Sequence, residues 1–343
     1  MRPHRKRIFP PLAAALVAVY PVAAAAQEQG YPFRLSNFKL EFSTGATAIN
    51  PEHLNILADF EEAFLRFHYL QRYEALKPAG YEVSLERTGD SAFRPLNRAT
   101  PWGFRLKYEL SPTLALALGL QYLSASQGSS VAFLATGRNA GGAAFTDRYE
   151  NPGFGLWLKA WLPQLTATFG WNIGPAFRYE LFIAGGPMLV EVGAESDVRR
   201  TFTGSDGSLS ETSELRSMRG KASSWEGEAG AILRLSPWRF LDLFCEGSYA
   251  FREAREFQGP GTSRLRSSSS AAGESVEEKA WDGTWQVVLV SSKTAWGTFD
   301  SSNVVNNVSW NVHPRPRKFE VQFSGFQVKF GLEVLRAAPP ARI

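Results

Sequence analysis

Charged side chains that recur at every second position are the residues best placed to do chemistry in this chain. Arg105, Lys107 and Glu109 alternate with apolar residues. In a β-strand this spacing puts side chains on one face, where charges from neighbouring strands can meet. Such a face forms either an ion path or a salt-bridge network that fills an interior, and we favour the network. The predicted network contains Arg105, Lys107, Glu109, Arg178, Glu180, Glu226, Glu228, Arg234, Asp242, Glu246, Lys329 and Glu333.

The histidines are the next candidates, because a hydrolase or acyltransferase would pair one with a serine and a carboxylate. Three histidines follow residue 26, and no sequence pattern links His53 or His68 to a catalytic serine. His313, near Asp300, is the candidate for a lipid-modifying site, but we favour a solvated loop histidine. There is no HExxH motif, cysteine pair or carboxylate-rich calcium loop. We therefore expect no enzymatic activity, no metal and no cofactor.

The N-terminal segment has the features of an export signal. Basic residues up to Arg7 precede an apolar run that small residues close near Ala26, which predicts a signal peptide over residues 1–26. Without the four Lys and Arg residues of this segment, 33 basic and 33 acidic side chains remain. The formal charge of +4 is therefore no argument for nucleic-acid binding. No later stretch approaches the roughly 18 apolar residues of a membrane-spanning helix.

The charged faces must be positioned by β-strands, and segment 102–124 shows the pattern most clearly. Two alternating arms flank Ser111, Pro112 and Thr113, which predicts an antiparallel hairpin. The same alternation predicts eight strands, with ten as the alternative if segments 285–290 and 308–312 also cross. The eight strands are expected at 33–43, 102–110, 114–123, 154–171, 177–192, 225–235, 240–251 and 318–335.

One segment has a helical period instead. Asn50 is a suitable N-cap and Pro51 a suitable first residue for a helix over about 51–76. We expect this helix to be an N-terminal plug or a lid in the first outer loop. Its apolar face is formed by Ile56, Phe60, Phe64 and Phe67. Polar segments 125–152 and 197–224, and the region after 253, are predicted to be long loops, and 337–343 a frayed tail.

The alternation leaves open which face meets solvent, and the loop lengths and charges decide it. Tight turns alternate with long connections, and Trp and Tyr lie near strand ends, as in outer-membrane barrels. A Lys or Arg facing the bilayer midplane costs about 2–4 kcal/mol, so the charged faces should line the interior. We predict an all-β fold, a closed antiparallel transmembrane up-and-down β-barrel.

The export signal, the hairpin RLKYELSPTLALALGLQYLS, the strand YELFIAGGPMLV and the closing FQVKFGLEV together resemble a known class. They are similar to the small outer-membrane β-barrels of Gram-negative-type bacteria, the OmpA/OmpX/OmpW-like class. The resemblance implies the bacterial outer membrane, contact with its lipid, the barrel assembly machinery and an unknown extracellular ligand. We expect a non-enzymatic structural or surface-interaction role. The alternatives are a narrow, porin-like channel or transporter for small hydrophobic molecules and a lipid-modifying enzyme.

Overall fold

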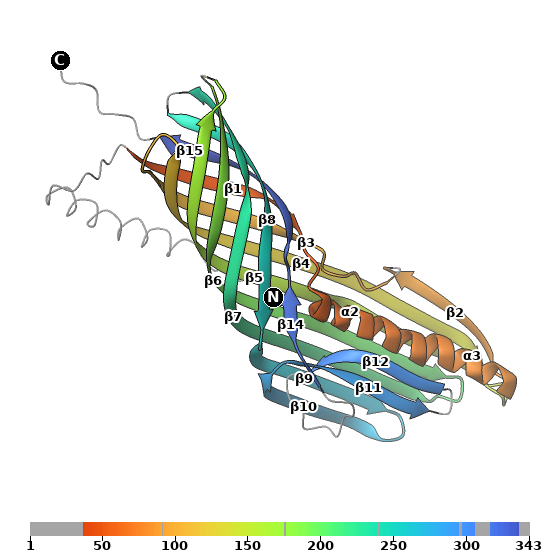
Figure 1. Ribbon diagram of the computed structural model, residues 1–343. Helices are drawn as coiled ribbons and strands as arrows, with labels where there is room; N and C mark the ends of the chain where they lie inside the picture. The colour runs from red at the N-terminus through yellow and green to blue at the C-terminus, as the bar shows by residue number, and fades with distance from the viewer. Residues whose placement is uncertain are drawn as a thin grey trace, which may run out of the picture.

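Eight antiparallel strands form a closed ring in the computed structural model, which describes residues 37–90, 92–174, 176–238, 240–294, 297–305 and 316–335 (Figure 1). Around the ring the order is β1–β3–β4–β5–β6–β7–β8–β15, and β15 pairs with β1 to close it. The strands are β1 (Phe38–Ala48), β3 (Arg98–Glu109), β4 (Leu114–Arg138), β5 (Ala144–Asn172), β6 (Phe177–Gly204), β7 (Leu209–Trp238), β8 (Leu241–Arg255) and β15 (Gly325–Leu335). The predicted eight-stranded up-and-down barrel is confirmed.

The tight turns gather at one end of the ring. In the β3–β4 turn the Leu110 N–H donates to the Leu114 carbonyl at 2.9 Å, and the Ser111 hydroxyl accepts from the Leu114 N–H at 3.0 Å. Phe38, the first residue of β1, lies opposite Tyr108, next to this turn. The barrel therefore begins and ends at the end where its short connections lie.

Four of the ring strands continue far beyond the ring, and the predicted loops at 125–152 and 197–224 are wrong. Strands β4, β5, β6 and β7 are 25, 29, 28 and 30 residues long. The polar composition of these segments hides an alternation of small and aromatic residues. Val131 and Phe133 of β4 and Tyr149 of β5, for example, are buried on one face. Pairing along the whole length of the strands satisfies the backbone and overrides the loop-like composition.

Further strands widen the outer part of β4–β7 into a curved sheet, here called the extension sheet. Strand β2 (Glu82–Gly89) pairs with β4, β9 (Gln258–Ser269) pairs with β7, and β10 (Gly273–Thr284) pairs with β9. Strand β14 (Glu320–Gln322) pairs with β8. The region after residue 253 is thus largely strand and not the predicted loop.

A separate sheet is formed by β11 (Gln286–Thr294), β12 (Gly297–Val305) and β13 (Arg317–Lys318). Strand β11 covers the predicted piece at 285–290, but it pairs with β12 and β13 and lies outside the ring. The ten-stranded alternative is therefore wrong on this strand. The predicted piece at 308–312, the signal segment 1–26 and the tail 337–343 lie outside the described residues.

A helical segment connects β1 to β2, where a helix was expected. It comprises α2 (Glu52–Leu65), the π-helical turn η2 (Arg66–Gln71), α3 (Arg72–Leu76) and the 3₁₀ turn η3 (Lys77–Ala79). Pro51 rather than Asn50 is the N-cap residue, and it makes no side-chain cap. Gly80 ends the segment with φ 87°, a left-handed conformation that glycine adopts without strain. None of the described helices is both long and apolar enough to cross a membrane.

The main hydrophobic core lies between this helix and the extension sheet, not inside the ring. Leu54 and Leu65 of α2 are fully buried against aromatic and aliphatic residues such as Phe133 and Leu156. Figure 1 shows the helix running along the inner side of the extension sheet, beside β12. Apolar burial therefore stabilises the outer part of the molecule, and the ring requires a different kind of interior.

Candidate functional site

The interior of the ring is lined by charged side chains from six of the eight ring strands, while β4 and β5 contribute small and neutral polar residues. They alternate with outward apolar residues, as the two-residue period of a strand requires. All twelve side chains of the predicted network point to this interior. The inward cations are Lys39, Arg105, Lys107, Arg178, Arg234, Arg252 and Lys329, and the inward carboxylates are Glu41, Glu109, Glu180, Glu226, Glu228, Asp242, Glu246 and Glu333.

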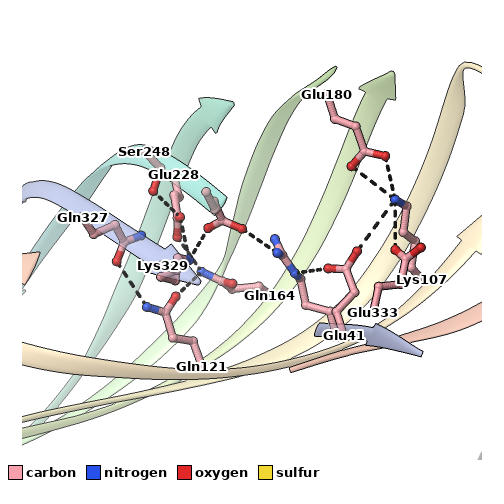
Figure 2. Close-up of polar contacts among 12 residues, drawn as sticks. Glu41, Lys107, Gln121, Gln164, Glu180, Glu228, Ser248, Gln327, Lys329 and Glu333 are labelled. Carbon is pink, nitrogen blue, oxygen red and sulfur yellow. Dashed lines mark hydrogen bonds and ion pairs between the residues drawn. The ribbon is translucent and has the colours of Figure 1, made fainter. Parts of the chain in front are cut away.

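Arg234 is the centre of a layer in the half of the barrel that lies toward the tight turns. Its guanidinium lies 2.5 Å from Glu41, 2.7 Å from Glu180 and 2.9 Å from Glu333. Lys107 reaches the same carboxylates, at 2.9 Å from Glu180 and 3.5 Å from Glu333. Figure 2 shows Lys107 between these two glutamates. Two cations and three carboxylates thus share one buried layer.

The middle of the barrel is crossed by a chain of ion pairs. Arg105 bridges Glu41 at 2.7 Å and Glu246 at 2.5 Å. Lys329 continues the chain from Glu246, at 2.5 Å, to Glu228, at 3.0 Å. Because every link joins residues on different strands, the charges tie the wall of the barrel together across its interior.

Neutral polar side chains complete the layer nearest the extension sheet. Arg252 donates to Glu226 at 2.8 Å, and the Gln164 amide donates to the same carboxylate at 2.8 Å. Gln121 donates to Gln327 at 3.3 Å, a contact visible in Figure 2. These side chains close the interior on the side where the strands leave the ring.

At the turn end, Glu109 and Arg178 join the network more loosely. Glu109 lies 2.8 Å from Lys39 and 3.6 Å from Arg178, while Arg178 lies 2.9 Å from Glu180. Asp242 is the predicted member that stands apart. It is buried opposite Glu333, and none of the ion pairs within the described part of the chain includes it.

The predicted network lacks Glu41, Lys39 and Arg252. Glu41 lies at its centre, Lys39 at the end near the tight turns and Arg252 at the end near the extension sheet. Glu41 contacts both Arg105 and Arg234. Their signal was the same alternation, since Lys39 and Glu41 flank Leu40 in β1. Gln121, Gln164 and Gln327 carry no charge, so only their inward register could have identified them.

The charged interior leaves little free space. The cavity between Arg105, Gln121, Gln164 and Lys329 has a volume of about 10 Å³. A water molecule needs roughly 10–15 Å³ of such volume. An eight-stranded barrel is only wide enough for side chains to fill it. The side chains around this cavity therefore act as a plug.

Replacing Arg234 by Met should destabilise the protein by about 3–5 kcal/mol, because the carboxylates of Glu41, Glu180 and Glu333 would lose their shared cation inside the barrel. Urea-induced unfolding followed by tryptophan fluorescence measures this. The matched control is Arg264→Met, which removes a solvent-exposed partner of Glu278 at 3.1 Å and should change stability little. Equal losses in the two variants would contradict the assignment of Arg234 to the centre of the network.

The predicted lid residues pack against β12. Phe60, Phe64 and Phe67 surround Phe299, with ring centroids 5.8, 6.3 and 5.3 Å away. Ile56, the fourth residue of the predicted face, packs against the main core. The helix thus has two apolar faces, one on the extension sheet and one on β12, and the sequence period identified mainly the second.

A buried acid anchors the second half of the helix to the extension sheet. The Asp147 carboxylate of β5 accepts a hydrogen bond from the Tyr73 hydroxyl at 2.6 Å and two from the Arg200 guanidinium, at 2.9 and 2.6 Å. The Tyr69 hydroxyl lies 3.5 Å from the same carboxylate. Burial, together with this carboxylate, raises the pKa of both tyrosines. The phenols therefore remain donors at neutral pH.

A surface groove of about 560 Å³ lies between the helix and β12. This volume falls within the range of small-ligand sites. Its floor is apolar and its rim is charged, which is the chemistry of a site for an amphipathic ligand or peptide. The lining residues are Ala63, Arg66, Phe67, Leu70, Gln71, Glu74, Thr298, Phe299 and Asp300.

Neighbouring acids on the helix have opposite pKa shifts. Burial raises the pKa of Glu61, and Arg216, whose Nη1 is 3.5 Å away, offsets this only partly. Burial alone would also raise the pKa of Glu62, but its hydrogen bonds and ion pairs with Arg87 and Arg66 lower it. At neutral pH, ionised Glu61 therefore opposes docking of the helix, and ionised Glu62 supports it.

We expect Glu61→Gln to strengthen docking of the helix at pH 7. A raised folded-state pKa gives stability that is present below the unfolded pKa, about 4.3, and is lost as pH rises through the folded value. Because glutamine does not ionise, the substitution should remove the stability loss that the ionisation of Glu61 causes at pH 7. Hydrogen exchange of residues 52–76, corrected for the intrinsic pH dependence of exchange, measures the free energy of local opening.

Glu62→Gln is the matched control with the opposite sign. Its lowered pKa gives stability that is present above the unfolded pKa and is lost as pH falls through the folded value. This variant should therefore weaken protection of the helix at pH 7. The same direction of change in both variants would contradict the assigned environments.

The histidines are held by structural contacts. His53 Nδ1 accepts a hydrogen bond from the Glu320 N–H at 3.0 Å, and the His68 ring packs on Phe64 with centroids 4.2 Å apart. Burial, together with Arg200 and Arg72, lowers the pKa of His68. His313, the candidate for a lipid-modifying site, lies outside the described residues.

Comparisons with known proteins identify no family. No family model matches the sequence, and no curated protein matches it. Among solved structures, the chain is similar to the outer membrane protease OmpT from Escherichia coli, with 10% sequence identity and a TM-score of 0.23. The alignment covers 87% of this chain and 94% of that chain. The OmpA/OmpX/OmpW-like resemblance gains no family support from these comparisons.

Proposed function

We propose that this chain is a non-enzymatic bacterial outer-membrane barrel. Its extension sheet and the helix packed on it would form a rigid interaction platform outside the membrane. The observation that carries the proposal is the outward face of the ring. Large apolar side chains such as Leu118, Ile183 and Phe330 are more than half exposed there. Water disfavours an apolar belt of this size on a soluble protein, whereas hydrocarbon favours it.

The belt has the height and borders that a bilayer requires. It extends over residues 161–171 of β5 and 225–235 of β7, close to the 9–11 residues of a tilted membrane strand. Exposed Trp171 and Trp238 lie at the turn end, and Trp102 and Trp225 at the other. Within these strand segments the outward positions carry no Asp, Glu, Lys or Arg. Aromatic borders around an uncharged belt are typical of outer-membrane barrels.

Such a barrel would reach its membrane through the predicted export signal and be inserted by the barrel assembly machinery. The tight turns would face the periplasm, and the extension sheet with its helix would face outward. We propose that the groove between the helix and β12 contacts the extracellular ligand, since it combines apolar and charged groups at the outer part of the molecule. The packed interior supports a structural or surface-interaction role over a channel.

A charge in the middle of the belt should prevent stable insertion. We expect Leu118→Arg to destabilise the folded protein in lipid vesicles by about 2–4 kcal/mol. The matched control is Leu215→Arg, because Leu215 is exposed to a similar degree, 55% against 64%, but lies on the outer part of β7. Urea titrations scored by heat-modifiable gel migration measure both. Equal effects, or a protein soluble without detergent, would refute the membrane placement.

Planar-bilayer recording separates the structural role from the channel alternative. Because the described interior is filled by ion pairs, the inserted protein should give no conductance above that of protein-free bilayers in the same salt. Uptake of small hydrophobic molecules into vesicles that contain the protein should likewise match that of empty vesicles. Steady conductance or protein-dependent uptake would instead establish the channel or transporter.

A further inference from the structure

A cluster of exposed cations lies just beyond the apolar belt, on the outward faces of β5, β6 and β7. Lys159 lies opposite Glu191, which lies opposite Lys221. In the next row outward, Trp157 lies opposite Gly193, which lies opposite Arg219. Two adjacent rows across three strands thus bring these cations together, although they come from sequence positions about 60 residues apart.

The Trp157 ring lies between the sheet and two of the cations, Lys159 and Arg219. The Lys159 Nζ lies 5.1 Å and the Arg219 Cζ 5.5 Å from the centre of its ring. The ring lies across Gly193, where a Cβ atom would come within 2.3 Å of the indole. A side chain at position 193 would displace the ring, so the glycine lets the tryptophan lie against the sheet under both cations.

The cluster is not neutralised. Glu191 is its one carboxylate, 3.5 Å from the Arg219 Nε and 3.9 Å from the Lys221 Nζ. These distances are longer than the roughly 2.7–2.9 Å of a strong charged hydrogen bond. The side chains of Arg219 and Lys221 are 59% and 72% exposed. Three cations with one loosely paired carboxylate leave an excess of two positive charges open to an anion.

The position of the cluster identifies the anion. The row directly below it contains Trp161 and Leu189, which are exposed and belong to the belt. One row of the same face is two residues, or roughly 7 Å of strand. The cluster therefore lies at the depth of the lipid headgroups if the belt lies in the hydrocarbon. In the next row outward Glu195 replaces the cations, so the cluster ends at this depth.

We propose that Lys159, Arg219 and Lys221 bind the phosphate group of an anionic membrane lipid, whose acyl chains lie on Trp161 and Leu189. This site rests on the membrane placement proposed above. Glu191 positions the two cations of β7, and Trp157 supports Lys159 and Arg219. The ligand is a lipid phosphate and not a free anion, because the apolar surface that continues below the cations would otherwise remain uncovered.

The test uses the full chain folded in detergent, with native mass spectrometry to count bound lipid. Phosphatidylglycerol and phosphatidylcholine with the same acyl chains are the probes. The wild type should retain phosphatidylglycerol in preference to phosphatidylcholine, and the preference should fall as ionic strength rises. The variant K159Q/R219Q/K221Q should lose this preference, by about fivefold for each cation removed.

The matched control, R264Q/R266Q/K279Q, removes the same charge from exposed ion pairs on β9 and β10. It should bind phosphatidylglycerol as the wild type does. If the triple variant at the cluster does not fold, the single variant Lys221→Gln gives the same comparison. Undiminished phosphatidylglycerol binding in the folded variant would overturn the site, as would its displacement by millimolar inorganic phosphate.

Failure of the membrane placement would appear separately. In that case the wild type would remain soluble without detergent and show no heat-modifiable form in phosphatidylcholine vesicles, before any lipid is counted. If instead the wild type and the variant insert equally and bind both lipids equally, the barrel placement stands and the lipid site is refuted.

Discussion

The width of an eight-stranded ring is the constraint on which the rest of the structure depends. Its interior admits side chains and little else, so most inward charges are compensated by another side chain at short range. Arg234, with three carboxylates within 2.9 Å, shows how this is done. The ring leaves no room for an apolar core of ordinary size, and apolar side chains occupy its outer wall instead. The uncharged outer belt and the filled polar interior both follow from closing the sheet into a ring of eight strands.

The main hydrophobic core is displaced to the extension sheet for the same reason. There the sheet is open, and one face can be covered by the helix and by β12. Leu54 and Leu65 are buried in that core, while Asp147 holds the far end of the helix through Tyr73. The molecule therefore has two kinds of interior. Ion pairs across strands stabilise the ring, and apolar burial stabilises the platform.

The ring was predictable because its strands alternate strictly between charged or small residues and large apolar ones. The hairpin around Ser111 follows from that period, and the inward direction of Arg105 and Lys107 follows from the cost of placing a charge in the bilayer. The extension was not predictable in the same way, because Gly, Ser and Asn in segments 125–152 and 197–224 resemble loop composition. Pairing with neighbours over the full strand length decided their structure. Partners in the network were also hidden, since Glu41 and Arg234 are 193 residues apart.

The continuity of β4–β7 from the ring into the extension has a mechanical consequence. The outer part of β5, residues 144–160, spans roughly 55 Å at about 3.3 Å per residue. It belongs to one continuous strand, whose pairing with β6 shifts register once, between Glu150 and Gly155. Strands β4–β7 are paired with one another both in the ring and in the extension sheet. The extension sheet is therefore attached rigidly to the wall of the barrel at one end. It rises from one half of the rim only, since the partner strands on the other half are short (Figure 1). A force applied to the tip would be transmitted as bending of the sheet and tilt of the barrel, instead of being absorbed by a hinge.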